Sequence, residues 1–115
     1  MYDLGERTLQ YAKDVSIYCK NLKKSIVTIE YTKQMIRSAG SVGANYIEAN
    51  EALSEKDFIY RIKICKKEAK ETCYWLKLAN YYQNDVYLYT EGEKLICEAM
   101  ELVKIFSAII RNKIK

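Results

Sequence analysis

Lysine and tyrosine side chains recur at helical spacing between residues 56 and 81, where they could bind a nucleic acid. One stripe repeats every seven residues and comprises Lys56, Lys63, Lys70 and Lys77. The neighbouring stripe comprises Tyr60, Lys67, Tyr74 and Tyr81. Neither stripe contains an acidic residue. Because ammonium groups bind phosphates and aromatic rings stack on exposed bases, this helix face is a candidate surface for RNA or DNA.

A second basic cluster lies at the end of the first predicted helix and is a candidate for the same partner: Lys20, Lys23 and Lys24. Both clusters have an alternative interpretation, because lysines are common on solvated helix faces and tyrosines are enriched in subunit contacts. The last predicted helix carries a group of acids, Glu91, Glu93, Glu98 and Glu101. If copies of the chain form a ring, one copy's basic surface could pair with the next copy's acidic surface, leaving no charge for a nucleic acid.

Few residues suit catalysis or metal binding. The four cysteines, Cys19, Cys65, Cys73 and Cys97, form no CxxC pair, and the chain has no histidine. A cysteine nucleophile would therefore lack a histidine base, and a zinc site would lack histidine ligands. No ExxH motif occurs, so a di-metal site between helices is not expected. We expect reduced cysteines that serve as small packing residues, no metal, no cofactor and no enzymatic activity.

The composition is typical of a single globular domain spanning residues 1–115. Half of the residues are hydrophobic and 30% are charged, which excludes disorder, and the net charge of +4 permits an anionic partner without requiring one. No apolar run approaches the roughly 18 residues of a membrane-spanning helix. The first residues, MYDLGER, are charged from the third position and do not resemble a signal peptide. We therefore expect a cytoplasmic protein with no membrane partner.

The absence of proline and the four glycines predict few turns and long helices. Three helices are expected at about residues 6–23, 28–53 and 55–82, with Ser25 or Thr28 capping the second and Ser54 capping the third. The capping-box pattern Thr90-Glu91-Gly92-Glu93 predicts the start of a fourth helix that ends in RNKIK.

The third segment has the clearest apolar pattern, with a buried seam expected at Phe58, Ile62, Cys65, Ala69, Thr72, Leu76 and Ala79. The spacing of this seam alternates between four and three residues, as in the core of an antiparallel bundle. Four long helices with short connections predict an all-α fold, namely an antiparallel up-down-up-down four-helix bundle.

A run of small residues, SAGSVGA at 38–44, interrupts the second predicted helix. Its GxxG could be a phosphate-binding loop of the KH type, but that fold needs strands and no strand pattern occurs here. It could instead be a hinge. We favour a third interpretation, in which Gly40 and Gly43 let a helix with bulky side chains, such as Trp75 or Phe106, approach closely. The packing gained would offset roughly 1 kcal/mol of lost helix propensity per glycine.

Polar residues beside this run form a stripe that needs partners inside a largely apolar bundle. Arg37, Ser41 and Glu48 share one helical face, and Asn45 lies near it. Glu68 and Glu71 on the third helix are the expected partners of Arg37. Two interpretations remain open: a structural hydrogen-bond network that fixes the register of the helices, and a catalytic or ligand site. We favour the network.

The segment from Gln34 to Ala79 resembles the small bacterial four helix bundle protein family, which includes the large-subunit rRNA intervening-sequence proteins. The accessory variability determinant of diversity-generating retroelements is a structural relative of that family. The matching motif residues are Arg37, Ser41, Asn45, Glu48, Ser54, Glu71 and the pair Trp75-Leu76. Many relatives carry proline where this chain has Gly43 and glycine where it has Ala49, and these departures favour a continuous helix.

The resemblance implies a four-helix bundle that assembles as a ring, commonly a homopentamer, with no known enzymatic activity. For the retroelement relatives it implies binding of nucleic acid and of a reverse transcriptase. We therefore expect a homo-oligomeric accessory or scaffold protein that binds RNA or DNA through basic outer helix faces. The alternative is a structural or protein-interaction module that binds no nucleic acid.

Overall fold

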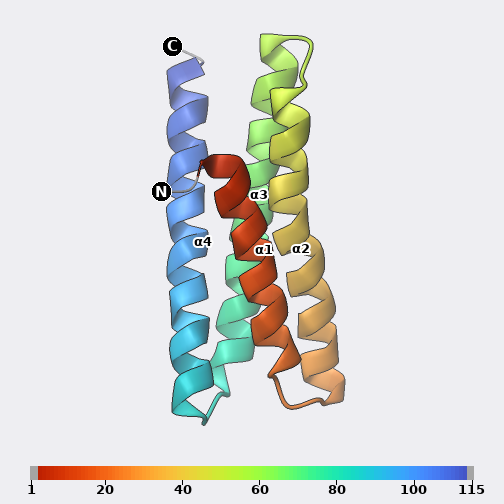
Figure 1. Cartoon of the computed structure of the whole chain (residues 1–115), viewed down its shortest axis with the longest axis vertical. Helices are drawn as coiled ribbons and strands as arrows, with labels where there is room; N and C mark the ends of the chain where they lie inside the picture. The colour runs from red at the N-terminus through yellow and green to blue at the C-terminus, as the bar shows by residue number, and fades with distance from the viewer. Residues whose placement is uncertain (1–2, 114–115) are drawn as a thin grey trace.

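The computed structural model describes residues 3–113 and contains four α-helices. They are α1 (Leu4–Lys20), α2 (Ile26–Asn50), α3 (Glu55–Tyr81) and α4 (Val86–Lys113). Short connections join successive helices at alternating ends of the molecule (Figure 1). Residues 3–113 include no strand. The chain is therefore all α, consistent with the predicted four-helix bundle.

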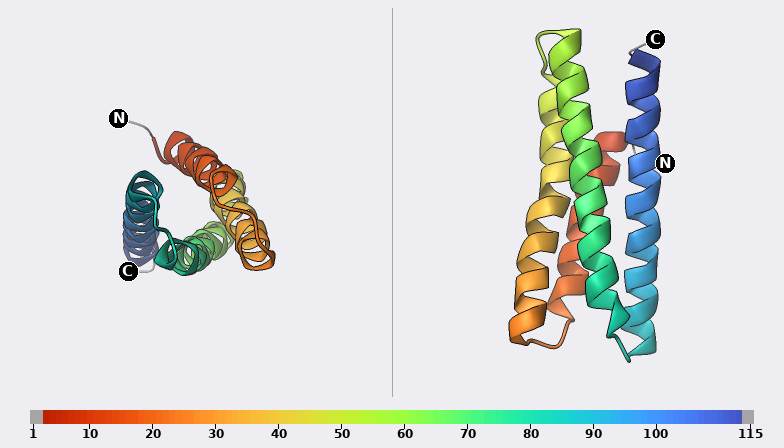
Figure 2. Two further views of the ribbon diagram at one scale, coloured as in Figure 1. Left: turned by 90° about the horizontal axis from the view of Figure 1, so that it is seen from below. Right: turned by 180° about the vertical axis from the view of Figure 1, so that it is seen from behind.

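The helices surround one apolar core (Figure 2). Each helix packs against the next, and α1 also contacts α4 to close the circle. The predicted seam of α3 is confirmed, because all of its members are buried except Phe58, which is half-buried. The facing stripe of α4 is also buried, at Leu95, Ala99, Leu102 and Phe106.

Local capping residues explain where the second and third helices begin. Ser25 and Thr28 were alternative caps for α2, and both take part in one capping box. The Ser54 hydroxyl accepts a hydrogen bond from the Asp57 amide at 3.1 Å, as predicted for α3. The first helix begins and ends slightly earlier than expected, at Leu4 and Lys20.

The predicted start of the last helix is wrong. The helix begins at Val86, and the Asp85 carboxylate accepts a hydrogen bond from the Leu88 amide at 2.8 Å. Thr90 lies inside the helix, where its hydroxyl donates to the Val86 carbonyl at 2.8 Å. Asp85 therefore acts as the helix cap, a role that the sequence analysis had given to Thr90.

The small-residue run lies within α2, which continues through it unbroken. This excludes a KH-type loop and gives no support to the hinge. Gly43 does approach another helix, but its neighbour is Thr8 of α1, so the proposed contact with Trp75 or Phe106 is wrong. A Cβ atom at Gly40 would meet nothing within 4 Å, so Gly40 does not pack closely within this chain.

The closest helix approach at a glycine is on α4 instead. A Cβ atom at Gly92 would collide with the amide group of Asn80 on α3. Asn80 is buried, accepts a hydrogen bond from the Tyr18 hydroxyl at 2.8 Å and donates to the Tyr89 carbonyl at 3.0 Å. Only glycine leaves room for this amide, so Gly92 fixes the contact between α3 and α4.

Candidate nucleic-acid interface

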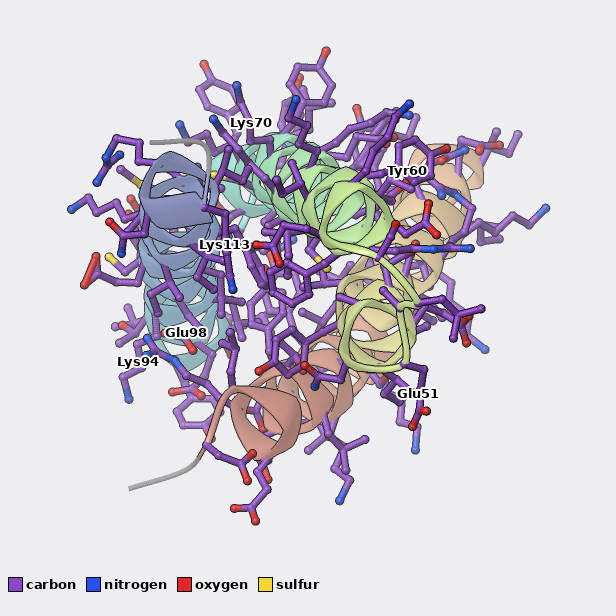
Figure 3. The ribbon with its side chains drawn as sticks, turned by 90° about the horizontal axis from the view of Figure 1, so that it is seen from above. Glu51, Tyr60, Lys70, Lys94, Glu98 and Lys113 are labelled. Carbon is purple, nitrogen blue, oxygen red and sulfur yellow. The ribbon has the colours of Figure 1, made fainter. Side chains whose placement is uncertain are left out.

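The two predicted stripes form the exposed outer face of α3. All eight of their side chains are exposed. Lys70 and Tyr60 project from the side of α3 that faces away from α1 (Figure 3). The buried seam explains this orientation, since it holds the opposite face of α3 against the other helices.

The middle of this face contains a hollow of about 600 Å³ that combines cations with aromatic rings. Its lining comprises Lys63, Lys66, Lys67, Lys70, Glu71, Tyr74 and Trp75. The sequence analysis did not assign Lys66 or Trp75 to this site. Trp75 was predicted to pack against the small-residue run of the second helix, yet only part of its side chain is buried. The available signal was position, because Lys66 lies about one turn before Lys70 and Trp75 directly follows Tyr74.

The two acids nearest the hollow have a cation of their own. Arg37 of α2 lies 3.3 Å from a Glu68 carboxylate oxygen and 3.0 Å from a Glu71 carboxylate oxygen. This confirms the predicted partners of Arg37. Arg37 offsets one of the two negative charges, so the carboxylates reduce the positive charge of the neighbouring lysines by less than their number suggests.

The lysines of the outer face, in contrast, make no salt bridge with any carboxylate of residues 3–113. Their ammonium groups are therefore available to an external anion. Long exposed lysines are strongly hydrated and act as point charges. They therefore suit contact with phosphates whatever the base sequence of the nucleic acid.

The acids of α4 are satisfied within the same chain. Glu98 holds the Arg7 guanidinium of α1 through two hydrogen bonds of 2.7 Å, and this contact raises the pKa of Arg7 above its ordinary value. Glu91 and Glu101 pair with lysines one turn away on α4, and Glu93 accepts a hydrogen bond from Asn80. The acidic surface is therefore less available to a neighbouring subunit than the sequence suggested.

The ends of the α3 face differ from its middle. Tyr60 borders a separate hollow of about 320 Å³ whose lining includes Glu48, Glu51 and Asp57. These carboxylates would repel a phosphate. Lys56 is exposed but lines neither hollow, so the structure does not bring Lys56 and Tyr60 together with the central lysines.

Lys77 belongs to a hollow of about 420 Å³ between α3 and α4. This hollow shares Lys70 and Tyr74 with the central one and is otherwise lined by Cys73, Met100, Val103 and Lys104. Lys70 and Tyr74 therefore form a ridge between two adjacent hollows. The cationic surface continues along α3 from the central hollow to Lys77.

The second predicted cluster lies elsewhere. Lys20 ends α1, and Lys23 and Lys24 lie in the connection to α2, at one end of the molecule (Figure 1). All three are exposed. None of them lines the central hollow, so this cluster is a separate candidate.

The predicted polar network divides into separate groups. Asn45 donates to the Ser41 hydroxyl at 2.9 Å and accepts from Arg61 of α3 at 3.0 Å, while Arg37 pairs with Glu68 and Glu71. Ser54 acts only as a cap, and Glu48 lines the acidic hollow. A buried hydrogen bond of 2.8 Å between the hydroxyls of Thr72 and Ser38 was not predicted. These contacts join α2 to α3, as expected of a network that fixes register.

Burial keeps most of the cysteines unreactive. Cys19, Cys65 and Cys73 are buried, and burial raises the pKa of Cys19 to about 11 and that of Cys65 to about 12. The prediction that Cys97 is a packing residue is wrong, because its side chain is exposed on α4.

In residues 3–113, no group of histidine, cysteine or carboxylate side chains is arranged to hold a metal ion.

None of the helices in the described range combines the length and apolar character needed to cross a membrane.

A sequence model of the family described as 23S rRNA-intervening sequence protein matches residues 3–108. A crystal structure of a protein of unknown function from the S23 ribosomal protein family of Bacteroides thetaiotaomicron is similar in fold, with a TM-score of 0.78 and 31% sequence identity. The match covers 94% of this chain and 98% of that one. No curated protein sequence matches this chain.

Proposed function

The chain belongs to the 23S rRNA-intervening sequence protein family, and we propose that it is a non-enzymatic accessory protein that binds RNA or DNA through the outer face of α3. The single observation that carries this proposal is the central hollow. Four lysines and two aromatic rings line it, and its one acid is already paired with Arg37. Cationic grooves that contain aromatic rings suit nucleic-acid strands bound without strong sequence preference.

We further propose that the helices form an antiparallel bundle and that copies of this bundle assemble as a ring-shaped homo-oligomer. The alternating ends at which the connections lie support the antiparallel arrangement (Figure 1). Support for assembly comes from an open apolar groove of about 580 Å³ between α1 and α2. Gly40, Ala44 and the exposed side chains of Leu9 and Ile47 line this groove.

The groove suits a helix of a second copy. Gly40 has free space above it, so another backbone can approach closely, and large apolar side chains flank it. Contact between copies on this side would leave the outer face of α3 open to a nucleic acid. In a ring, repeated copies of the face would bind one strand with an avidity above that of a single subunit. Light scattering tests assembly, and a monomeric mass at micromolar concentration would contradict it.

The same groove favours the alternative function, a structural or protein-interaction module without nucleic-acid binding. A reverse transcriptase partner, implied by the family resemblance, stays a prediction. Salt dependence separates the two functions, because phosphate contacts weaken steeply with salt while an apolar interface does not.

The test is fluorescence anisotropy of a labelled RNA hairpin and a DNA duplex, titrated with the protein at several salt concentrations. We expect binding whose logarithm falls linearly with the logarithm of salt, by about 0.7 to 0.9 per phosphate contacted. Absence of binding to both at low salt would contradict the proposed function and leave the protein-interaction module.

A further inference from the structure

The two aromatic rings of the central hollow contact each other. Trp75 is the only tryptophan of the chain. The Tyr74 ring stands edge-on to it, with ring centroids 5.3 Å apart and an interplanar angle of 81°. Trp75 also packs against Tyr31 of α2, with centroids 5.9 Å apart, and against the core. Since these neighbours already orient Trp75, its side chain would lose little conformational entropy when a base contacts it.

The Tyr74 ring is also accessible. Its side chain is 59% exposed although it contacts Trp75, so a large part of its surface faces solvent beside the hollow. Exposed aromatic surface between lysines is costly to leave in water, and another flat ring would cover it well.

The Trp75 indole packs partly on the core and partly borders the hollow. The Trp75 Nε1 atom is buried and has no hydrogen-bond partner among residues 3–113. An unsatisfied buried donor is unfavourable, and a phenylalanine at this position would avoid that cost. The large indole instead extends the aromatic wall of the hollow next to Tyr74.

The lysines of the hollow all lie on one side of the rings along α3, where the phosphates on one side of a stacked base would pass. Lys63, Lys66 and Lys67 lie about two to three helical turns before Tyr74, and Lys70 lies about one turn before it. All four line the same hollow as the rings. The hollow of about 600 Å³ is shallow and runs along α3 alone, so a base and its sugar could lie in it with one side facing solvent.

We propose that this hollow binds an unpaired base of a single-stranded nucleic acid, which stacks on the exposed ring of Tyr74 beside Trp75, with the lysines on the phosphates to one side of that base. A paired duplex keeps its bases stacked inside the helix and cannot offer a free ring to the hollow. The site therefore selects single strands, loops and ends over duplexes. This proposal rests on the proposed function and specifies its ligand.

The test uses three DNA probes with the same fluorescent label: a twelve-nucleotide oligothymidylate, an abasic strand of equal length and charge, and a duplex of twelve base pairs. Affinity is measured by anisotropy, and stacking by quenching of the intrinsic fluorescence of Trp75. We expect oligothymidylate to quench Trp75 and to bind roughly 5- to 150-fold more tightly than the abasic strand, the range that base stacking gives. The duplex should not quench it.

Two variants assign the effect to the hollow. Tyr74→Leu should lower the affinity for oligothymidylate toward that for the abasic strand and leave the abasic strand unaffected. Tyr87→Leu is the matched control, because Tyr87 is an exposed tyrosine of α4 that lies outside the hollow and outside the α3 face. It should change neither affinity.

The negative results of these experiments lead to different conclusions. Equal affinity for the oligothymidylate and abasic strands, without quenching, would overturn the base-binding hollow while leaving the basic face as a phosphate-binding surface. Absence of binding to every probe at low salt would remove the proposed function and this proposal with it. Equal losses from Tyr74→Leu and Tyr87→Leu would also overturn the hollow as the site of stacking.

Discussion

The outer faces of α3 and α4 are similar in length and rich in charge, yet they use that charge differently. On α4 the acids Glu91, Glu98 and Glu101 each hold a cation of the same chain. On α3 the lysines of the central hollow have no carboxylate partner within residues 3–113. Charges paired inside the chain support the fold, whereas unpaired charges of one sign around a hollow are available to a ligand. Changes on α3 should therefore alter binding, and changes on α4 should alter stability.

The largest expected effect is charge reversal on the binding face. Replacing Lys63, Lys67 and Lys70 with glutamate should lower the affinity for single-stranded DNA about 100-fold at 0.1 M salt. The estimate follows from the loss of three phosphate contacts. Each contact contributes about 0.7 to the slope of log affinity against log salt concentration, so three contribute about two orders of magnitude at 0.1 M salt. Anisotropy measures the affinity, and circular dichroism should show an unchanged fold. The control is Lys94→Glu on α4, which lies outside the hollows of the α3 face, and an equal loss in that control would break the comparison.

The second effect concerns stability and involves the contact that α4 makes with α3. Gly92→Ala places a methyl group against the buried Asn80 amide and should reduce the free energy of unfolding by about 2 kcal/mol. Thermal or urea denaturation measures the loss. Gly40→Ala, measured at a concentration too low for copies to assemble, is the control, because its Cβ atom meets nothing within 4 Å in the chain and it should be stabilising by up to about 1 kcal/mol. Similar effects from the two variants would mean that Gly92 is not packed as described.

A smaller loss of stability is expected from the ion pair between α1 and α4. Glu98→Gln keeps the shape of the side chain but removes the charge that holds Arg7, and should cost about 1 kcal/mol because the pair is partly exposed. Urea denaturation measures the cost. The affinity for DNA should stay unchanged, and a loss of affinity would show that the two faces are not independent.

The smallest expected effect on the affinity for DNA comes from chemical modification of the outer face of α4. At pH 8 one thiol per folded chain should react readily with Ellman's reagent, since Cys97 is exposed while burial raises the pKa values of Cys19 and Cys65 to about 11 and about 12. All four should react in denaturant. Alkylation of Cys97 should not change the affinity for DNA, and lost binding would place the nucleic acid on α4 instead.

Much of the fold could be predicted because the buried face of a helix appears in the sequence as apolar residues three or four positions apart. The seam from Ile62 to Ala79 is buried as its spacing predicted, and Ser54 caps α3. The start of α4 was missed because two capping patterns compete there, and Asp85 forms the cap in place of Thr90. The tight glycine was missed because periodicity identifies a face but not the neighbour across it. Gly92 meets Asn80, whereas Gly40 meets no other side chain.

The candidate site was only partly predictable for the same reason. Spacing along one helix identified the lysine stripe and the partners of Arg37. It could not show that carboxylates from the end of α2 gather near Tyr60, because that depends on how α2 meets α3. Trp75 borders the hollow on α3 alone, and its place beside Tyr74 was a signal that the stripe pattern did not use. Charge pairing between α1 and α4 likewise joins residues that are far apart in the chain.

Photo-crosslinking tests the central claim most directly, because it reports which helix touches the nucleic acid in the unmodified protein. The protein would be irradiated with a single strand that carries 5-iodouracil, and the crosslinked peptides identified by mass spectrometry. Binding at the central hollow predicts crosslinks at residues 63–77 of α3, with Tyr74 and Trp75 prominent. Crosslinks confined to residues 91–104 of α4 or to the connection around Lys23 would contradict it.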